Sequence, residues 1–345
     1  MKGRNKSSYS ADLTNDFLSG AFDEDRVEEN EKFSDRSKHA QHHKTIKTQA
    51  ARDANSTVEV DAMPLGEVIQ VHSLFLEVLS GGVVYRCTQR KTLAKVSDTQ
   101  IVVGDFVKFA LAPERNDVVA NEGAIARIEP RRTILMRADS FKAIEVHPIV
   151  ANADQMLIVA ALHLPEVKWG LVDRMVIAAR SGGLAPVICL NKIDTAASEQ
   201  DLADAAAVLA HYETLGVPTL RTSAPTGQGL DALRDVLRDK TSVLAGHSGV
   251  GKSSLVRVVE PSIDLAALRV GAISQVHSKG MHTTTSARKF PLSFGGHVID
   301  TPGVKLFGLW NTPADGLIAH YPDVEAGTAP TWRAESYERI LKSLT

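Results

Sequence analysis

The stretch GHSGVGKSSL, residues 246–255, has the phosphate-binding form G-x-x-x-x-G-K-S. Its glycines permit a tight turn in which backbone N–H groups face phosphate oxygens. The apolar run SVLAG leads into the loop and the run KSSLVRVV follows it, so the sequence predicts the strand and the helix that this motif needs on its two sides. In a simple nucleotide-binding domain the loop follows the first strand, whereas here 245 residues come before it.

The loop also predicts roles for particular side chains. We expect Lys252 to reach the β- and γ-phosphates of a nucleotide and the Ser253 hydroxyl to coordinate Mg²⁺. A helix that begins at Lys252 would add the positive end of its dipole to the anion site.

A second pattern, NKID, follows the apolar run PVICL and predicts a guanine pocket. A carboxylate accepts both the N1–H and the exocyclic amino group of guanine, a donor pair that adenine lacks, so Asp194 would select guanine. Asn191 would brace the base and the loop, and the stem of Lys192 would cover the purine face.

Two shorter patterns complete the set. Ser223 and Ala224, in the run TSA, follow a strand-like run and could place a backbone amide at guanine O6. The run DTPG begins at Asp300, which would hold Mg²⁺ through water, and ends at Gly303, whose amide would sense the γ-phosphate. Each of the two patterns is weak alone.

The order of these patterns predicts the fold. All four follow strand-like runs, at the strand ends where open α/β sheets place ligands. An ordinary GTPase has the phosphate loop first, then D-x-x-G, N-K-x-D and S-A, whereas this chain has N-K-x-D, S-A, phosphate loop and D-x-x-G. Because the termini of a compact domain often lie close together, such a permutation can keep the fold. We therefore predict a circularly permuted α/β P-loop GTPase domain whose mostly parallel sheet is covered on both faces.

We place this domain at residues 131–310, where apolar runs alternate with amphipathic ones. Strands are expected at 155–162, 185–192, 217–224, 241–248 and 296–303, and helices at 169–182, 199–216, 229–239 and 252–259.

The rest of the chain divides into three parts. Residues 1–62 are polar and rich in both signs of charge, and we predict a disordered tail because they cannot bury enough apolar surface to offset their ordering entropy. Residues 63–130 hold about five short alternating runs with turn signals and predict an OB-type β-barrel. Such barrels often bind RNA, but a barrel that only packs on its neighbour fits these residues equally well. Residues 311–345 predict a short helical C-terminal segment with a helix at 334–344.

Composition limits the classes of function. The formal net charge of −2 over 345 residues means that any nucleic-acid surface must be a local patch. Two cysteines, Cys87 and Cys189, are too few for a disulfide framework or a cysteine-rich metal site, and we expect both to be buried apolar residues in a reducing compartment. The N-terminus lacks the apolar core of a signal peptide, and no apolar run is long enough to span a bilayer. We expect a soluble, cytoplasmic monomer with no membrane partner.

Between the phosphate loop and DTPG lies SKGMHTTTSARKF, which we expect to act as a switch that closes on Mg²⁺ and the γ-phosphate. Among Thr283, Thr284 and Thr285 we favour Thr284 as the magnesium ligand. Ordinary small GTPases place a Gln after D-x-x-G to orient the attacking water. Here that position is Val304, which cannot do so. His282 is our candidate for positioning the water, although a histidine that packs against or caps the loop fits as well.

From about residue 65 to the C-terminus, the sequence resembles the circularly permuted ribosome small-subunit-dependent GTPases of bacteria. The resemblance rests on the runs VVGDFVKF, VANADQMLIVAAL, NKID, GHSGVGKSSL, KGMHTTTSARKF, DTPGVKLFGL and RAESYERIL. It implies a late assembly factor that binds the small ribosomal subunit and its rRNA, hydrolyses GTP to GDP and phosphate, and leaves upon hydrolysis. It also implies that hydrolysis is slow alone and stimulated by the subunit.

The sequence departs from that family near its C-terminus. The family usually carries a zinc module built from three Cys and one His, whereas residues 311–345 contain no Cys. His320 alone cannot make a four-ligand zinc site, so we expect no zinc.

Three functions remain open at the level of the sequence: a stimulated GTPase, a GTP-dependent RNA- or ribosome-binding sensor with little hydrolysis, and a general RNA-binding protein with a vestigial GTPase domain. The intact Lys252, Asp194 and Asp300 argue against the last. We expect Lys252, Thr284 and His282 to serve catalysis, and Ser253, Thr284 and Asp300 to hold Mg²⁺. The residues expected to bind GTP or GDP are Asn191, Lys192, Asp194, Ser223, Ala224, Gly246, His247, Ser248, Gly249, Val250, Gly251, Lys252, Ser253, Ser254, Asp300 and Gly303.

Overall fold

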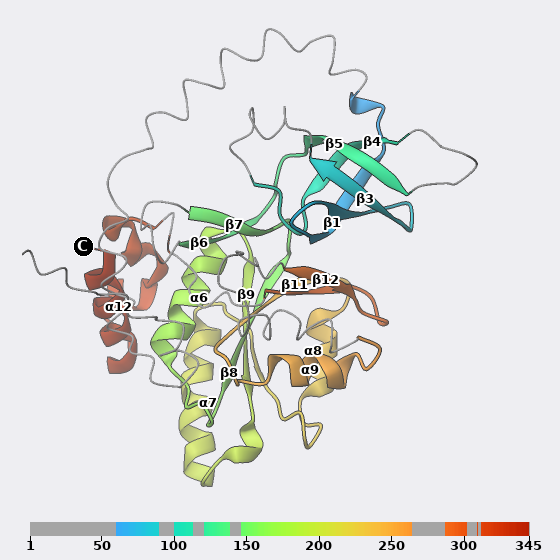
Figure 1. The fold of residues 1–345 in the computed structure, drawn as a ribbon. Helices are drawn as coiled ribbons and strands as arrows, with labels where there is room; N and C mark the ends of the chain where they lie inside the picture. The colour runs from blue at the N-terminus through green and yellow to red at the C-terminus, as the bar shows by residue number, and fades with distance from the viewer. Residues whose placement is uncertain are drawn as a thin grey trace, which may run out of the picture.

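The computed structural model describes residues 60–89, 100–112, 121–138, 146–263, 287–301, 309 and 312–344, and Figure 1 shows their arrangement. The predicted tail at 1–62 lies almost entirely outside these residues. A β-barrel stands beside a larger α/β unit, and C-terminal helices pack on the side of that unit (Figure 1).

The barrel consists of five strands in the described part of the chain: β1 (Leu65–Val71), β2 (Leu76–Ser80), β3 (Val83–Gln89), β4 (Phe106–Leu111) and β5 (Glu122–Ile128). They pair in the order β1-β2-β3-β5-β4, and β4 pairs back with β1, which closes the barrel. Alternate residues point inward, as period-2 strands require, and the apolar interior includes Val68, Val78 and Phe109. The predicted OB-type barrel is confirmed.

The α/β unit is built on five parallel strands: β8 (Gln155–Ala161), β9 (Ala185–Asn191), β10 (Thr219–Arg221), β11 (Thr241–Ala245) and β13 (His297–Asp300). A sixth strand, β12 (Arg288–Pro291), runs antiparallel to β13. Every residue of β8 is buried, because a central parallel strand is covered on both faces.

Helices cover the two faces of this sheet (Figure 1). On one face lie α6 (Trp169–Ser181) and α7 (Glu199–Thr214), and α12 (Thr331–Leu344) packs against α6. On the other face lie α8 (Leu230–Leu237) and α9 (Lys252–Val259). The buried apolar residues accordingly form one cluster on each face. This is the circularly permuted P-loop GTPase fold that the motif order predicts.

Some elements differ from the prediction. β10 covers three residues where eight were expected, because its register pairs with β9 extend only from Thr219 to Arg221. A separate hairpin of β6 (Ile134–Ala138) and β7 (Val146–Ala151) was not predicted. The C-terminal helix begins three residues early, and the 3-10 helix η2 (Ala314–His320) and the short helix α11 (Pro322–Glu325) precede it.

The C-terminal segment is held by a buried polar cluster. The Arg333 side chain is 2% exposed and forms ion pairs with Asp173 of α6 and Asp323 of α11. The hydroxyl of Tyr212 donates to Asp173 over 2.5 Å, and His211 pairs with Asp323 over 2.7 Å. This cluster joins α12 to both helices on that face, because Tyr212 and His211 belong to α7.

Two further findings concern composition and surface. Both cysteines are buried, as predicted, and burial raises the pKa of each thiol to about 11. Among the described residues, no group of three or more His, Cys, Asp or Glu is placed to hold a metal ion, and none of the described helices is both long enough and apolar enough to cross a membrane.

The barrel and the α/β sheet are directly hydrogen-bonded. Gln70 of β1 is the register partner of Arg288 of β12, so barrel and sheet form a continuous run of eleven strands in the described part of the chain. A second junction joins the barrel to the end of β7, where Asn152 donates from its side chain to the Gly104 carbonyl over 2.8 Å. Gly104 has φ +88°, and a Cβ atom there would lie 1.9 Å from the Ala151 carbonyl oxygen, so the close approach requires glycine.

Candidate nucleotide site

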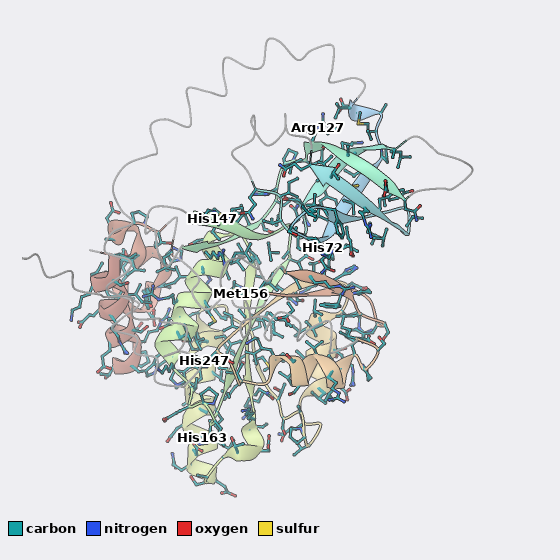
Figure 2. The ribbon with its side chains drawn as sticks, in the orientation of Figure 1. His72, Arg127, His147, Met156, His163 and His247 are labelled. Carbon is teal, nitrogen blue, oxygen red and sulfur yellow. The ribbon has the colours of Figure 1, made fainter. Side chains whose placement is uncertain are left out.

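The sequence patterns meet at one edge of the sheet. β9, β8, β11 and β13 are parallel neighbours, so their carboxyl ends lie together. NKID begins in the last residue of β9, the phosphate loop follows β11 and DTPG begins in the last residue of β13. Met156, near the start of β8, lies closer to the barrel than His163 and the phosphate-loop residue His247 do (Figure 2). The phosphate loop and the segment after β8 are therefore farther from the barrel than the start of β8 is, whereas Asp300 is separated from β1 by β12 alone.

The phosphate loop is built on glycines that no other residue could replace without strain. Gly246 has φ +135°, and a Cβ atom there would lie 2.1 Å from the Val159 carbonyl oxygen of β8. Gly251 has φ +97°, and a Cβ atom there would lie 2.4 Å from the Asn191 side-chain nitrogen. Both are distances that a real Cβ atom does not adopt, so the glycines let the loop backbone fold closely over β8 and Asn191.

Lys252 begins α9 and turns back into the loop. Its ammonium donates to the carbonyl oxygens of Gly246 over 2.6 Å and His247 over 2.9 Å. Burial lowers the pKa of Lys252 to about 8, although the nearby Asp300 opposes this change. Phosphate oxygens would compensate this buried charge more fully than two neutral carbonyls do.

Asp300 and Ser253 offer oxygen ligands beside this ammonium. Burial raises the pKa of Asp300, and Lys252 lowers it. Ser253 is exposed at the first turn of α9. A carboxylate and a hydroxyl are the hard oxygen donors that suit Mg²⁺, so the described part of the site fits the ion. The other residues predicted to act here, His282, Thr284 and Gly303, lie outside the described residues, as does Val304.

Asn191 connects the base-binding loop with the phosphate loop. Its side-chain amide donates to the Val250 carbonyl over 2.9 Å, and its oxygen accepts from the Thr222 hydroxyl over 3.1 Å. Both side chains are buried, and because the Val250 carbonyl can only accept, it fixes the amide nitrogen toward Val250 and leaves the oxygen facing Thr222. The predicted role of Asn191 at the base stays a prediction, and the sequence analysis assigned Thr222 no role beyond its membership of the run TSA.

The remaining base-side residues differ in their exposure. Asp194 is exposed in the 3-10 helix η1 (Ile193–Thr195), where its carboxylate can accept from a ligand. Ser223 is buried and its amide already donates to the Gln228 carbonyl over 3.0 Å. The Ala224 amide is therefore the better candidate for guanine O6.

Lys192 has a left-handed backbone, with φ 60°, which is strained for a residue other than glycine. Its ammonium donates to the Leu164 carbonyl in the segment that follows β8. That segment also approaches the phosphate loop, since a Cβ atom at Gly249 would lie 3.6 Å from Pro165. Residues 163–168 carry no recognisable motif, so nothing in the sequence indicates that they border the site.

An apolar cleft lies next to the phosphate loop. Its walls come from β8, α6, the segment after β8 and His247 of the loop. Ser248 and Gly249 at the tip of the loop and Ser254 in α9 are exposed, whereas Val250 is buried. The tip of the loop therefore faces solvent, whereas its other side lies against apolar side chains.

The fold and the sequence of this chain have counterparts among known proteins. The pattern of the RsgA GTPase family matches residues 128–310, more than half of the chain. This chain belongs to the RsgA GTPase family. It is accordingly a GTPase that binds GTP and GDP, and the predicted resemblance is confirmed.

Relatives match well beyond the family pattern. A small ribosomal subunit biogenesis GTPase RsgA from Sodalis glossinidius (strain morsitans) is 35% identical over 318 residues, which cover 82% of this chain and 88% of the relative. A protein of the same name from Haemophilus influenzae (strain 86-028NP) is 32% identical over 309 residues, covering 81% of this chain and 85% of the relative.

Solved structures agree with the fold. The crystal structure of YjeQ from Thermotoga maritima superposes with a TM-score of 0.64 at 26% identity and covers 81% of this chain and 98% of that one. YloQ, described as a circularly permuted GTPase, has a TM-score of 0.59 at 23% identity over 83% of this chain and 96% of its own. The likeness to YloQ supports the permuted fold alone. The roles given to individual residues stay predictions.

Proposed function

We propose that this RsgA GTPase binds the small ribosomal subunit, acts in its late maturation and hydrolyses GTP faster when bound. The observation that carries the proposal is that Lys252, Asp194 and Asp300 stand at one sheet edge, on a sheet hydrogen-bonded to a barrel of the OB type. The relatives' name supplies the partner.

In this proposal the chain's own groups bind and orient GTP. Lys252 would bind the β- and γ-phosphates, Asp194 would accept the two guanine donors, and Asn191 would keep the base loop in register with the phosphate loop. Ser253, Asp300 and Thr284 would hold Mg²⁺, whose charge would offset that of the phosphates. His282 would position the attacking water, because Val304 has no polar group with which to do so.

The barrel would provide the rRNA-binding surface, since OB-type barrels bind structured and single-stranded RNA. The protein would act in the cytoplasm, where its proposed partner is assembled, and we expect it to act as a monomer. The proposal needs no zinc module, as the buried cluster around Arg333 already attaches the C-terminal segment to α6 and α7.

A second candidate is a GTP-dependent sensor that binds RNA or the ribosome and hydrolyses little. The residue that favours it is Val304. In that case the nucleotide would stabilise a binding-competent shape and the small subunit would not change turnover.

Phosphate release tests the proposal. GTP, with ATP as the control nucleotide, is incubated with the full chain in the presence and absence of purified small ribosomal subunits. We expect phosphate release from GTP but not from ATP. Small subunits should strongly stimulate this release, and large subunits should not. Tight GTP binding without stimulation would reject the proposal in favour of the sensor. Phosphate release by the Lys252→Ala variant measures the activity of any contaminating hydrolase.

A further inference from the structure

A buried ion pair crosses the junction between the barrel and the GTPase sheet. Lys289 of β12 contacts Glu67 of β1 over 2.5 Å, and their side chains are only 5% and 17% exposed. Burial lowers the pKa of the neighbouring His297, Lys289 lowers it further, and Glu67 opposes the change. The three groups therefore interact within one poorly solvated cluster.

The strand β12, which carries Lys289, lies between the predicted magnesium site and the barrel. Arg288, the residue before Lys289, is the register partner of Asp300 on one side and of Gln70 on the other. β12 is therefore the strand that separates the predicted magnesium ligand Asp300 from the barrel. It is also the first described element after the stretch that holds the predicted switch threonines.

The backbone alone joins the two units weakly at this point. β1 and β12 share a single register pair, whereas β12 and β13 share four. A buried ion pair whose partners come from different units adds a constraint, because a shift of one unit against the other would lengthen a 2.5 Å contact between charges that water screens poorly. A shift of the barrel against the sheet would consequently move Lys289 and with it β12.

We propose that Glu67 and Lys289 are positioning residues that couple the barrel to the magnesium side of the nucleotide site through β12. A partner bound to the barrel then changes the rate of GTP hydrolysis, and GTP in turn changes the affinity of the barrel for that partner, because coupling between two binding sites is reciprocal. The inference rests on the proposed function for the identity of the partner, but the coupling itself is a property of this chain.

Hydrogen–deuterium exchange of the full chain tests the coupling without the partner. Exchange of the β1 amides is compared between protein saturated with a non-hydrolysable GTP analogue and protein saturated with GDP. We expect a difference of about fivefold or more in wild type, the lower end of typical allosteric coupling factors. The difference should be lost in Lys289→Met and in Glu67→Gln.

Two further variants make the result specific. Arg131→Met breaks another buried ion pair of the barrel, with Asp105 over 2.7 Å, without touching β12, and should keep the difference. The double variant Glu67→Lys, Lys289→Glu swaps the two charges, keeps an ion pair and should recover part of the difference in β1 exchange. It also tests the coupling where a single variant fails to fold. The inference is overturned if wild type shows no difference in β1, or if the difference survives in both single variants.

The same proteins are then assayed with purified small ribosomal subunits. We expect stimulation of GTP hydrolysis to fall about tenfold in Lys289→Met, within the usual range of coupling factors, and to persist in Arg131→Met. Wild type that shows the β1 difference but no stimulation would refute the proposed function while leaving the coupling in place. Stimulation that is equal in wild type and Lys289→Met would refute the coupling alone.

Discussion

Raising the pH should weaken GTP binding through the titration of a single group, Lys252. Burial lowers its pKa to about 8 in the free protein, although the nearby Asp300 opposes this change. Phosphates bound beside the ammonium would raise that pKa, because nearby negative charge favours the protonated form. A group whose pKa is higher in the complex contributes fully to affinity below its free pKa, and that contribution is lost as the pH rises above it.

The size of the effect follows from the free pKa of about 8. About nine-tenths of the free protein carries the charge at about pH 7, and about one-tenth at about pH 9. The dissociation constant of GTP should therefore rise about tenfold between these two values, which equals about 1.4 kcal/mol of binding free energy. At about pH 8, binding should take up about half a proton per nucleotide.

Isothermal titration calorimetry measures both quantities, since the apparent heat varies with the ionisation enthalpy of the buffer in proportion to the protons taken up. Lys252→Arg is the matched control, because an arginine stays charged throughout this range. Its curve also contains any titration of the guanine base, so the difference between the two proteins isolates Lys252. A wild-type affinity that does not change over this range, with no proton uptake, would refute the reasoning.

Three other substitutions test separate parts of the structure. Asp194→Asn leaves one acceptor oxygen for two guanine donors and should weaken GTP binding about 10- to 100-fold, and a competition that still favours GTP over XTP would show that the base pocket is misassigned. His282→Ala should preserve nucleotide affinity but lower subunit-stimulated turnover by about 100- to 10,000-fold, and unaltered turnover would remove His282 from the mechanism. Arg333→Met leaves two carboxylates buried without their cation, so urea unfolding should show a loss of about 3 to 5 kcal/mol. Glu335→Gln, on the exposed face of the same helix, should change the unfolding free energy by less than about 0.5 kcal/mol.

The parts of the fold that local chemistry dictates could be predicted from the sequence. The phosphate loop requires glycines at Gly246 and Gly251, and the apolar runs beside it are long enough to identify β11 and α9. The order of the four patterns then fixed the permuted topology. The expected helices also agree with the structure to within a few residues at each end, because each repeats its apolar residues at a helical spacing.

The contacts between distant segments could not be predicted in this way. The pairing of Gln70 with Arg288 joins strands that are far apart in the chain, and neither residue carries a local signal. Thr222 looks like an ordinary hydroxyl until the fold brings it against Asn191. The hairpin of β6 and β7 was missed because its second strand contains Pro148, which lowers the strand propensity of the run.

The shared strand pairing of barrel and sheet has a consequence for how the chain can be divided. A protein shortened to begin after the barrel would expose the β12 edge that β1 now covers, and would leave Lys289 without its partner Glu67. An uncovered strand edge is a template for pairing with other chains. The isolated GTPase domain should therefore associate or aggregate. The barrel and the GTPase domain are separate in topology, but the GTPase domain needs the barrel to remain soluble.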